Sequence, residues 1–186
     1  IFGSNGVEIV AEDLGTVPDF VRESLAREGI PGYKVFRWGR HWHTPGQPFR
    51  DPPEYPAVSV ATSGTHDTEP MTVWWAQAGL DERRAVLDTP SVQSRLRESD
   101  RTLALESPSL SSALRLTLLE VLFASGANLL ILPIQDVFGW SDRINQPATV
   151  GDQNWTWRLP WPTDRLSKEP EAIAVAERLR TWSATY

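Results

Sequence analysis

Four short apolar runs constrain the fold of this chain more than any other feature of its sequence. They are 7–15 (VEIVAEDLG), 32–38 (GYKVFRW), 57–64 (AVSVATSG) and 128–134 (NLLILPI). Stretches with helical patterns separate them, and strands that alternate with helices are typical of parallel β/α architecture. The last run is almost wholly apolar, so we expect a strand that is buried on both faces.

The helical pattern is strongest over 108–125. Its apolar residues recur at steps of three and four, which predicts one buried face made of Leu110, Ala113, Leu114, Leu118, Val121 and Leu122. Pro108 and Gly126 are the expected ends of this helix. We also expect a helix that is capped by Thr16 and stopped by Gly29, and further helices at about 68–78, 81–88, 91–98 and 169–183.

Four parallel strands with flanking helices are half of an eight-stranded β/α barrel, a fold that usually takes roughly 250 residues. We therefore expect residues 1–186 to form a single unit, the C-terminal half of a TIM-type (β/α)8 barrel. An open doubly wound sheet is the alternative. The sequence has no glycine-rich phosphate loop that would favour nucleotide binding in such a sheet.

Charge and composition exclude several kinds of partner. The net charge of −6 argues against nucleic acid, and no basic run suits an anionic membrane surface. The most apolar stretch, 116–134, contains Glu120, Gly126 and Asn128, so we do not expect it to span a membrane. The absence of cysteine excludes disulfides and is compatible with a cytoplasmic location. Nine tryptophans are more than a core of this size needs, and their flat faces suit sugars.

Carboxylates stand where two of the predicted strands end. Glu12 and Asp13 follow the first run, and His66 and Asp67 follow the third. In a β/α barrel, reacting groups stand at these strand ends. One carboxylate that moves protons and others that face a cationic transition state are what glycosidic chemistry needs. The alternative is that Glu12 and Asp13 cap the next helix or pair with an arginine.

The histidines suggest hydrogen bonding more than metal binding. His66 has no second histidine or cysteine at ligand spacing, and His41 with His43 lacks a third ligand. We therefore expect no metal and no cofactor. No serine lies in a G-x-S-x-G elbow, so a catalytic triad has no support.

A polar loop at 142–161 combines amide, guanidinium and indole side chains. Arg143, Asn145, Asn154 and Arg158 alternate there with Trp155, Trp157 and Trp161. This mixture suits sugar binding, and a well-packed surface loop is the alternative for each single residue.

Five motifs, in this order, resemble the C-terminal part of the 4-α-glucanotransferases of glycoside hydrolase family 77, the amylomaltases and disproportionating enzymes. They are VAEDLG (10–15), GIPGYKVF (29–36), GTHD (64–67), PIQDVFG (133–139) and RINQPATVGDQNWTWR (143–158). The resemblance implies a β/α barrel that transfers part of an α-1,4-glucan to the 4-OH of an acceptor glucan, by a retaining double displacement without a metal. It implies α-1,4-glucans and maltooligosaccharides as partners.

The resemblance also implies roles for single residues. Glu12 is similar to the general acid/base, and Asp67 to the carboxylate that holds the sugar hydroxyls. His66, Arg143, Asn145 and Asp13 are expected to bind substrate. Where the family usually has Asn-x-Pro-Gly, this chain has Asn145-Gln146-Pro147-Ala148.

The family's nucleophile motif, similar to Arg-x-Asp-His-Phe, does not occur in this sequence. We therefore expect the chain to be a piece of a longer enzyme, to be inactive alone, and to self-associate through exposed barrel edges. Two alternatives stay open: a related α-glucan hydrolase or branching enzyme, and a half-barrel that binds maltooligosaccharides without catalysis.

Overall fold

A three-stranded parallel sheet forms the centre of the chain in a computed structural model that describes residues 6–186. The strands β1 (Gly32–Val35), β2 (Ser59–Thr62) and β3 (Leu129–Leu130) lie in the order β1-β2-β3. Gly32 pairs with Ser59, and Val60 pairs with Leu129. The parallel β/α architecture expected from the sequence is confirmed for these three strands.

The strand predicted at 7–15 is reduced to a single parallel bridge between Ala11 and Gly32. The backbone N–H of Ala11 donates to the carbonyl of Pro31 at 2.9 Å. Val7, Ile9 and Val10 next to it are 39–49% exposed. No strand among residues 6–186 pairs with their outer side, so this run lacks the burial that stabilises a central strand.

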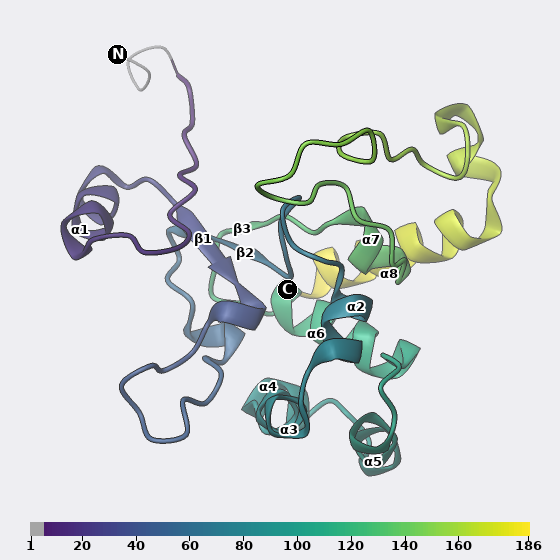
Figure 1. Cartoon of the computed structure of the whole chain (residues 1–186), viewed down its shortest axis with the longest axis horizontal. Helices are drawn as coiled ribbons and strands as arrows, with labels where there is room; N and C mark the ends of the chain where they lie inside the picture. The colour runs from purple at the N-terminus through teal and green to yellow at the C-terminus, as the bar shows by residue number, and fades with distance from the viewer. Residues whose placement is uncertain (1–5) are drawn as a thin grey trace.

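Helices surround the sheet unevenly (Figure 1). They are α1 (Asp19–Glu28), α2 (Met71–Gln77), α3 (Leu80–Leu87), α4 (Pro90–Gln93), α5 (Glu98–Glu106), α6 (Ser112–Phe123), α7 (Ile134–Phe138) and α8 (Pro170–Thr185), with 3-10 turns at Phe36–Trp38, Pro52–Glu54 and Thr163–Lys168. Figure 1 shows α1 beside β1, on the opposite side of the sheet from α6 and α8. The helix expected at 91–98 is the short α4, and α5 was not predicted.

The first helix begins later than expected. The prediction that Thr16 caps it was wrong, because Pro18 occupies the N-cap position and its side chain makes no capping hydrogen bond. The prediction for its end is confirmed: Gly29 closes α1 at φ 68°, a left-handed conformation that glycine adopts without strain.

The core lies between β2 and the helices that follow it. Trp75 of α2, Val86 of α3 and the α6 residues Leu114 and Leu118 are at most 1% exposed. The predicted apolar face of 108–125 is confirmed at four of its six positions, and Leu119 is buried as well. Ser111, not Pro108, starts the helix, because the Ser111 hydroxyl accepts a hydrogen bond from the backbone N–H of Leu114 at 3.1 Å.

The run at 128–134 was expected to be a strand buried on both faces, and this expectation was wrong. Only Leu129 and Leu130 form the strand, and Leu129 is 39% exposed. Ile131, just beyond the strand, is 52% exposed. Because β3 is the last strand of the described sheet, only one of its edges is paired.

Candidate functional site

Three threonines shape the loop that follows β2. The hydroxyl of Thr62 donates to the carbonyl of Gly64 at 2.6 Å. The backbone N–H of Thr65 donates to the hydroxyl of Thr68, and that of Asp67 donates to the hydroxyl of Thr65. Such local bonds between hydroxyl groups and the backbone stabilise tight turns. They hold His66 and Asp67 at the tip of the loop.

The Asp67 carboxylate is the centre of a polar cluster. Asn145 Nδ2 donates to its Oδ1 at 2.6 Å, and His66 Nε2 lies 3.3 Å from the same oxygen. Arg143 donates to the backbone carbonyl of Asp67 at 2.6 Å and to that of Asn145 at 2.7 Å. The structure therefore brings together four of the six predicted site residues, from segments 76 to 78 residues apart.

An indole ring lies beside this cluster. The ring of Trp155 is 5.2 Å from that of His66, with 39° between their planes, and Trp155 is 60% exposed. Its backbone N–H donates to the carbonyl of Ile144 at 2.8 Å, which joins the two ends of the loop. Asn154 closes the same loop with bonds to Gln146 and Thr149. An exposed aromatic face next to carboxylate and amide groups is a surface suited to a sugar ring.

Arg37 and Glu69 form an ion pair next to the cluster, and the sequence did not predict either residue as part of the site. Arg37 donates to the Glu69 carboxylate at 2.5 Å and to its backbone carbonyl at 2.8 Å, and Arg143 reaches the same carboxylate at 3.8 Å. Burial lowers the pKa of Arg37, and the nearby Glu69 carboxylate opposes that change. A single arginine after a strand carries no sequence signal that would have revealed this pair.

A buried carboxylate ties the two ends of the 63–71 loop together. Asp136 accepts a hydrogen bond from the hydroxyl of Ser63 at 2.5 Å and another from the backbone N–H of Met71 at 2.6 Å. Asp136 is 1% exposed, and burial raises its pKa, while these two hydrogen bonds act in the opposite direction. Asp136 is therefore placed to fix the loop and does not face solvent.

Glu12 and Asp13 point to opposite sides of the chain, as consecutive residues in extended backbone do. Glu12 is exposed and shares the lining of a pocket of about 250 Å³ with His66, Gln135 and Ile144. Asp13 is buried, and its carboxylate accepts a hydrogen bond from the backbone N–H of Tyr33 at 2.7 Å. Glu12 thus lies on the side of the Asp67 cluster, whereas Asp13 anchors β1 and faces a different pocket.

Gly32 makes the position of Asp13 feasible. A Cβ atom at Gly32 would come within 2.6 Å of the Asp13 carboxylate atoms. A residue without a side chain is therefore needed where the chain of 10–15 meets β1.

Among residues 6–186, no group of three or more histidine, cysteine, aspartate or glutamate side chains is arranged to hold a metal ion. His41 lies 3.1 Å from the carboxylate of Glu54. In the same described part of the chain, no helix has both the length and the apolar character to cross a membrane.

Comparison with known proteins decides the family. A sequence model of the 4-alpha-glucanotransferases, glycoside hydrolase family 77, matches residues 2–164. The chain belongs to this family. The resemblance noted from its five motifs is therefore confirmed.

Named relatives and solved structures agree with that assignment. The chain is 30% identical to a chloroplastic/amyloplastic 4-alpha-glucanotransferase of Arabidopsis thaliana, over 99% of this chain and 28% of that protein. It is 30% identical to the 4-alpha-glucanotransferase of Chlamydia caviae, over 81% of this chain and 28% of that protein. An amylomaltase from Streptococcus agalactiae in complex with acarbose matches with a TM-score of 0.68 at 26% identity, over 94% of this chain and 31% of that one.

A second solved structure, the amylomaltase from Corynebacterium glutamicum, matches with a TM-score of 0.74 at 20% identity, over 93% of this chain and 29% of that one. At that identity the match shows a shared fold. The chain spans about a third or less of the length of these proteins.

Proposed function

We propose that the chain carries the acid/base and sugar-binding part of a 4-α-glucanotransferase. The longer enzyme would transfer a segment of an α-1,4-glucan to the 4-OH of an acceptor glucose or glucan. The observation that carries the proposal is the cluster in which Asn145 and His66 approach one carboxylate oxygen of Asp67, beside the exposed ring of Trp155. The acarbose bound to the amylomaltase from Streptococcus agalactiae supports an oligosaccharide as ligand.

In this proposal, Glu12 moves protons at both stages of the reaction. Its carboxylic acid protonates the glycosidic oxygen while a nucleophilic carboxylate attacks C1, which breaks the C1–O bond and leaves a covalent glycosyl-enzyme. The Glu12 carboxylate then takes the proton from the acceptor 4-OH, whose oxygen attacks C1 and releases the nucleophile. Overall one glycosidic bond is broken and one is formed.

Asp67 holds the sugar during these steps. Its Oδ1 already accepts from Asn145, and its side chain is 41% exposed, so the carboxylate has room to accept hydrogen bonds from sugar hydroxyls. A carboxylate that is fixed by neighbours before the sugar arrives loses less conformational freedom on binding. Arg143 and Asn145 would fix it, and Trp155 would support a sugar face. Asp13, which binds the backbone of Tyr33, would act through the position of β1 and not through contact with substrate.

We further propose that the nucleophile comes from a preceding half of a (β/α)8 barrel, and that the three strands with the bridged segment at Ala11 form the other half. A retaining enzyme needs its two carboxyl groups about 5–5.5 Å apart. Support comes from the missing Arg-x-Asp-His-Phe motif and from the fraction of each relative that the chain spans. We expect the chain alone to be inactive. A cytoplasmic location stays part of the proposal.

The test is glucose release from maltotriose, with longer oligomers followed in parallel, for the chain alone and for a longer protein that contains it. We expect the longer protein to release glucose and to form oligomers longer than maltotriose, and the isolated chain to do neither. Glucose and maltose without longer products would indicate an α-glucan hydrolase. Activity of the isolated chain would contradict the placement of the nucleophile outside it.

A non-catalytic sugar-binding role is the second candidate. It is favoured by one observation: Glu12 is exposed, whereas Trp155 and the Asp67 cluster form a surface suited to a sugar ring without it. In that case maltotriose would bind, and the longer protein would release no glucose.

A further inference from the structure

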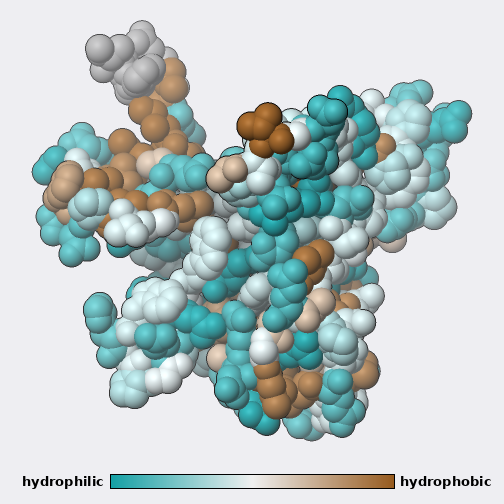
Figure 2. Space-filling model, viewed as in Figure 1, coloured by the Kyte–Doolittle hydropathy of each residue, from teal (hydrophilic) through white to brown (hydrophobic). Residues whose placement is uncertain are grey.

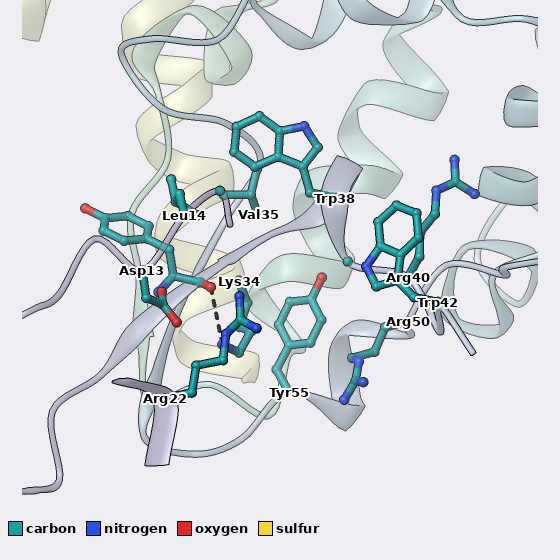
Figure 3. A pocket seen from close by; sticks show the side chains of 13 residues that line it. Asp13, Leu14, Arg22, Lys34, Val35, Trp38, Arg40, Trp42, Arg50 and Tyr55 are labelled. Carbon is teal, nitrogen blue, oxygen red and sulfur yellow. Dashed lines mark hydrogen bonds between the residues drawn. The ribbon is translucent and has the colours of Figure 1, made fainter. Parts of the chain in front are cut away.

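A second pocket lies on the other side of the Glu12–Asp13 pair from the Asp67 cluster. Its volume is about 560 Å³, within the range of small-molecule sites. Asp13, Tyr33 and Lys34 form one wall, α1 contributes Arg22, and the segment 38–55 forms the rest (Figure 3). Glu12, His66 and Asp67 do not line it, and Tyr33 is the one residue that lines both this pocket and the pocket beside Glu12.

The lining of this pocket is strongly cationic in a chain whose net charge is −6. Four basic side chains line it: Arg22, Lys34, Arg40 and Arg50. Arg40 is engaged elsewhere, because it stacks 3.8 Å above the ring of Phe49 and pairs with Glu82 at 3.4 Å. Asp13 is the one acidic residue among the lining residues, and its Oδ1 already accepts from Tyr33. The other three cations exceed it in number, which favours an anionic ligand.

A buried hydroxyl in the 38–55 part of the lining has no hydrogen-bond partner among the described residues. Tyr55 is 3% exposed, and its hydroxyl is one of the few buried polar atoms left unpaired. Burial raises the pKa of Tyr55, so this hydroxyl keeps its proton and is available as a donor. A buried polar group without a partner destabilises the fold, and a ligand oxygen that accepts from it would remove that cost.

Two exposed indole rings complete the pocket. Trp38 is 46% and Trp42 is 56% exposed, and both line it. In Figure 3, Arg22 and Lys34 lie on one side of Tyr55, and Arg50 and Trp42 lie on the other. A phosphate needs cations and donors, whereas the C–H face of a sugar ring needs an aromatic platform. This pocket offers both.

We propose that the pocket binds a phosphorylated monosaccharide. Arg22, Lys34 and Arg50 take the phosphate, the hydroxyl of Tyr55 donates to one of its oxygens, and Trp38 or Trp42 supports the sugar ring. Glu12, His66 and Asp67 are not among its lining residues, so binding in this pocket is tested independently of the proposed transferase activity.

The test is calorimetric titration of the chain with glucose 1-phosphate, inorganic phosphate and glucose, at low and at high salt. The expected result is saturable one-to-one binding of glucose 1-phosphate that weakens with salt, weaker binding of phosphate, and no comparable binding of glucose. Equal binding of glucose and glucose 1-phosphate would overturn the assignment to an anion. The absence of saturable binding by either phosphate compound would overturn the site.

Variants separate the site from a general charge effect. Arg22→Gln and Arg50→Gln should each weaken binding of glucose 1-phosphate about tenfold, in line with the loss of a charge-assisted hydrogen bond. The control Arg180→Gln, on an exposed arginine of α8, should leave it unchanged. An equal loss in the control would contradict a localised site.

Tyr55→Phe is the sharpest variant, because it keeps the ring and removes only the unpaired hydroxyl. A purely structural role predicts unchanged binding and equal or higher stability. The proposal predicts weaker binding of glucose 1-phosphate at a melting temperature that is not lowered. Unchanged affinity would remove the hydroxyl from the site.

Discussion

Asp67 lies at the tip of the 63–71 loop, and Asp136 of α7 binds the two ends of the same loop. Their surroundings give the two carboxylates different roles. Asp67 is partly exposed and approached by Asn145 and His66, so it can receive a ligand. Asp136 is buried beneath the loop and holds Ser63 and Met71. Residue type alone would have suggested the same chemistry for both; burial and partners distinguish them.

Asp136 should make stability depend on pH in a defined direction. Its pKa in the folded state is raised above the ordinary value of 3.8, mainly by burial, although Arg37 and Arg115 oppose this. The folded state therefore binds this proton more tightly, and the contribution of Asp136 to the free energy of unfolding should fall as pH rises from about 3.8 through the raised value.

Asp136→Asn should remove that dependence, because the amide does not titrate; its oxygen can accept from the backbone N–H of Met71, and its NH2 group can donate to the hydroxyl of Ser63. Urea unfolding of the wild type and of Asp136→Asn at several pH values measures this dependence. The contributions of the other titrating groups cancel in the difference between the two free energies of unfolding. The stability of the wild type relative to Asp136→Asn should decrease with rising pH. An increase in this relative stability with rising pH would contradict a raised pKa of the buried Asp136 carboxyl group.

At this scale, sequence reasoning found the functional residues by type and position but not by partner. His66 with Asp67 and Arg143 with Asn145 were both singled out. Their meeting across 76–78 residues depends on tertiary folding that no local pattern carries. Asp13 was expected to bind substrate, yet its side chain points to the opposite side of the extended backbone from that of Glu12. Its hydrogen bond from the backbone N–H of Tyr33 shows this orientation, which the sequence alone did not indicate.

Among the elements, the loop 143–158 departs most clearly from the family pattern. Ala148 stands where the family usually has glycine, and its φ of 57° lies in the left-handed region that favours glycine. Trp155, in the same loop, also has a positive φ of 63°. The loop therefore keeps the backbone turn although the side chain has changed.

Ala148→Gly should stabilise the protein by about 0.5–1 kcal/mol, because the relief of left-handed strain exceeds the entropy cost of glycine. The control Ala57→Gly, at an exposed alanine with a negative φ, should instead lower stability slightly. Urea unfolding measures both. A loss of stability in Ala148→Gly equal to that of the control would show that the turn is not strained.

Elements with a strong repeating pattern were predictable, and short apolar runs were not. The helix at 108–125 appears as α6, because its periodic leucines pack against the core from several sides. The runs at 7–15 and 128–134 have equally apolar sequences, yet they shrink to a bridge and a two-residue strand. Strand length depends on neighbours on both sides, and the described residues 6–186 supply only one neighbour for each run.

On the scale of the whole molecule, an apolar edge lies at the N-terminal ends of the strands; it is formed by Val7, Ile9, Val10, Val58 and Leu129, each 39–49% exposed. These residues line a hollow of about 580 Å³. Figure 2 shows hydrophobic surface where the 7–10 stretch joins the grey residues. Such an exposed apolar surface favours association with another chain.

We therefore expect the chain to self-associate through this apolar edge. Sedimentation velocity over a range of concentrations should show oligomers, and Val58→Lys should shift the distribution toward monomer. The control Val150→Lys changes a fully exposed valine in the distant polar loop and should have no such effect. A monomer at all concentrations would contradict self-association through the edge.

The central claim is that Glu12 moves the proton at the site where the Asp67 cluster holds the sugar. Its most direct test is the initial rate of maltotriose disproportionation by the longer protein that carries Glu12→Gln, with Glu8→Gln as the matched control. Glu8 is exposed and lines the separate hollow at the apolar edge. We predict that Glu12→Gln lowers the rate by about 10²–10⁴ and that Glu8→Gln leaves it unchanged. A rate that survives Glu12→Gln would contradict the account.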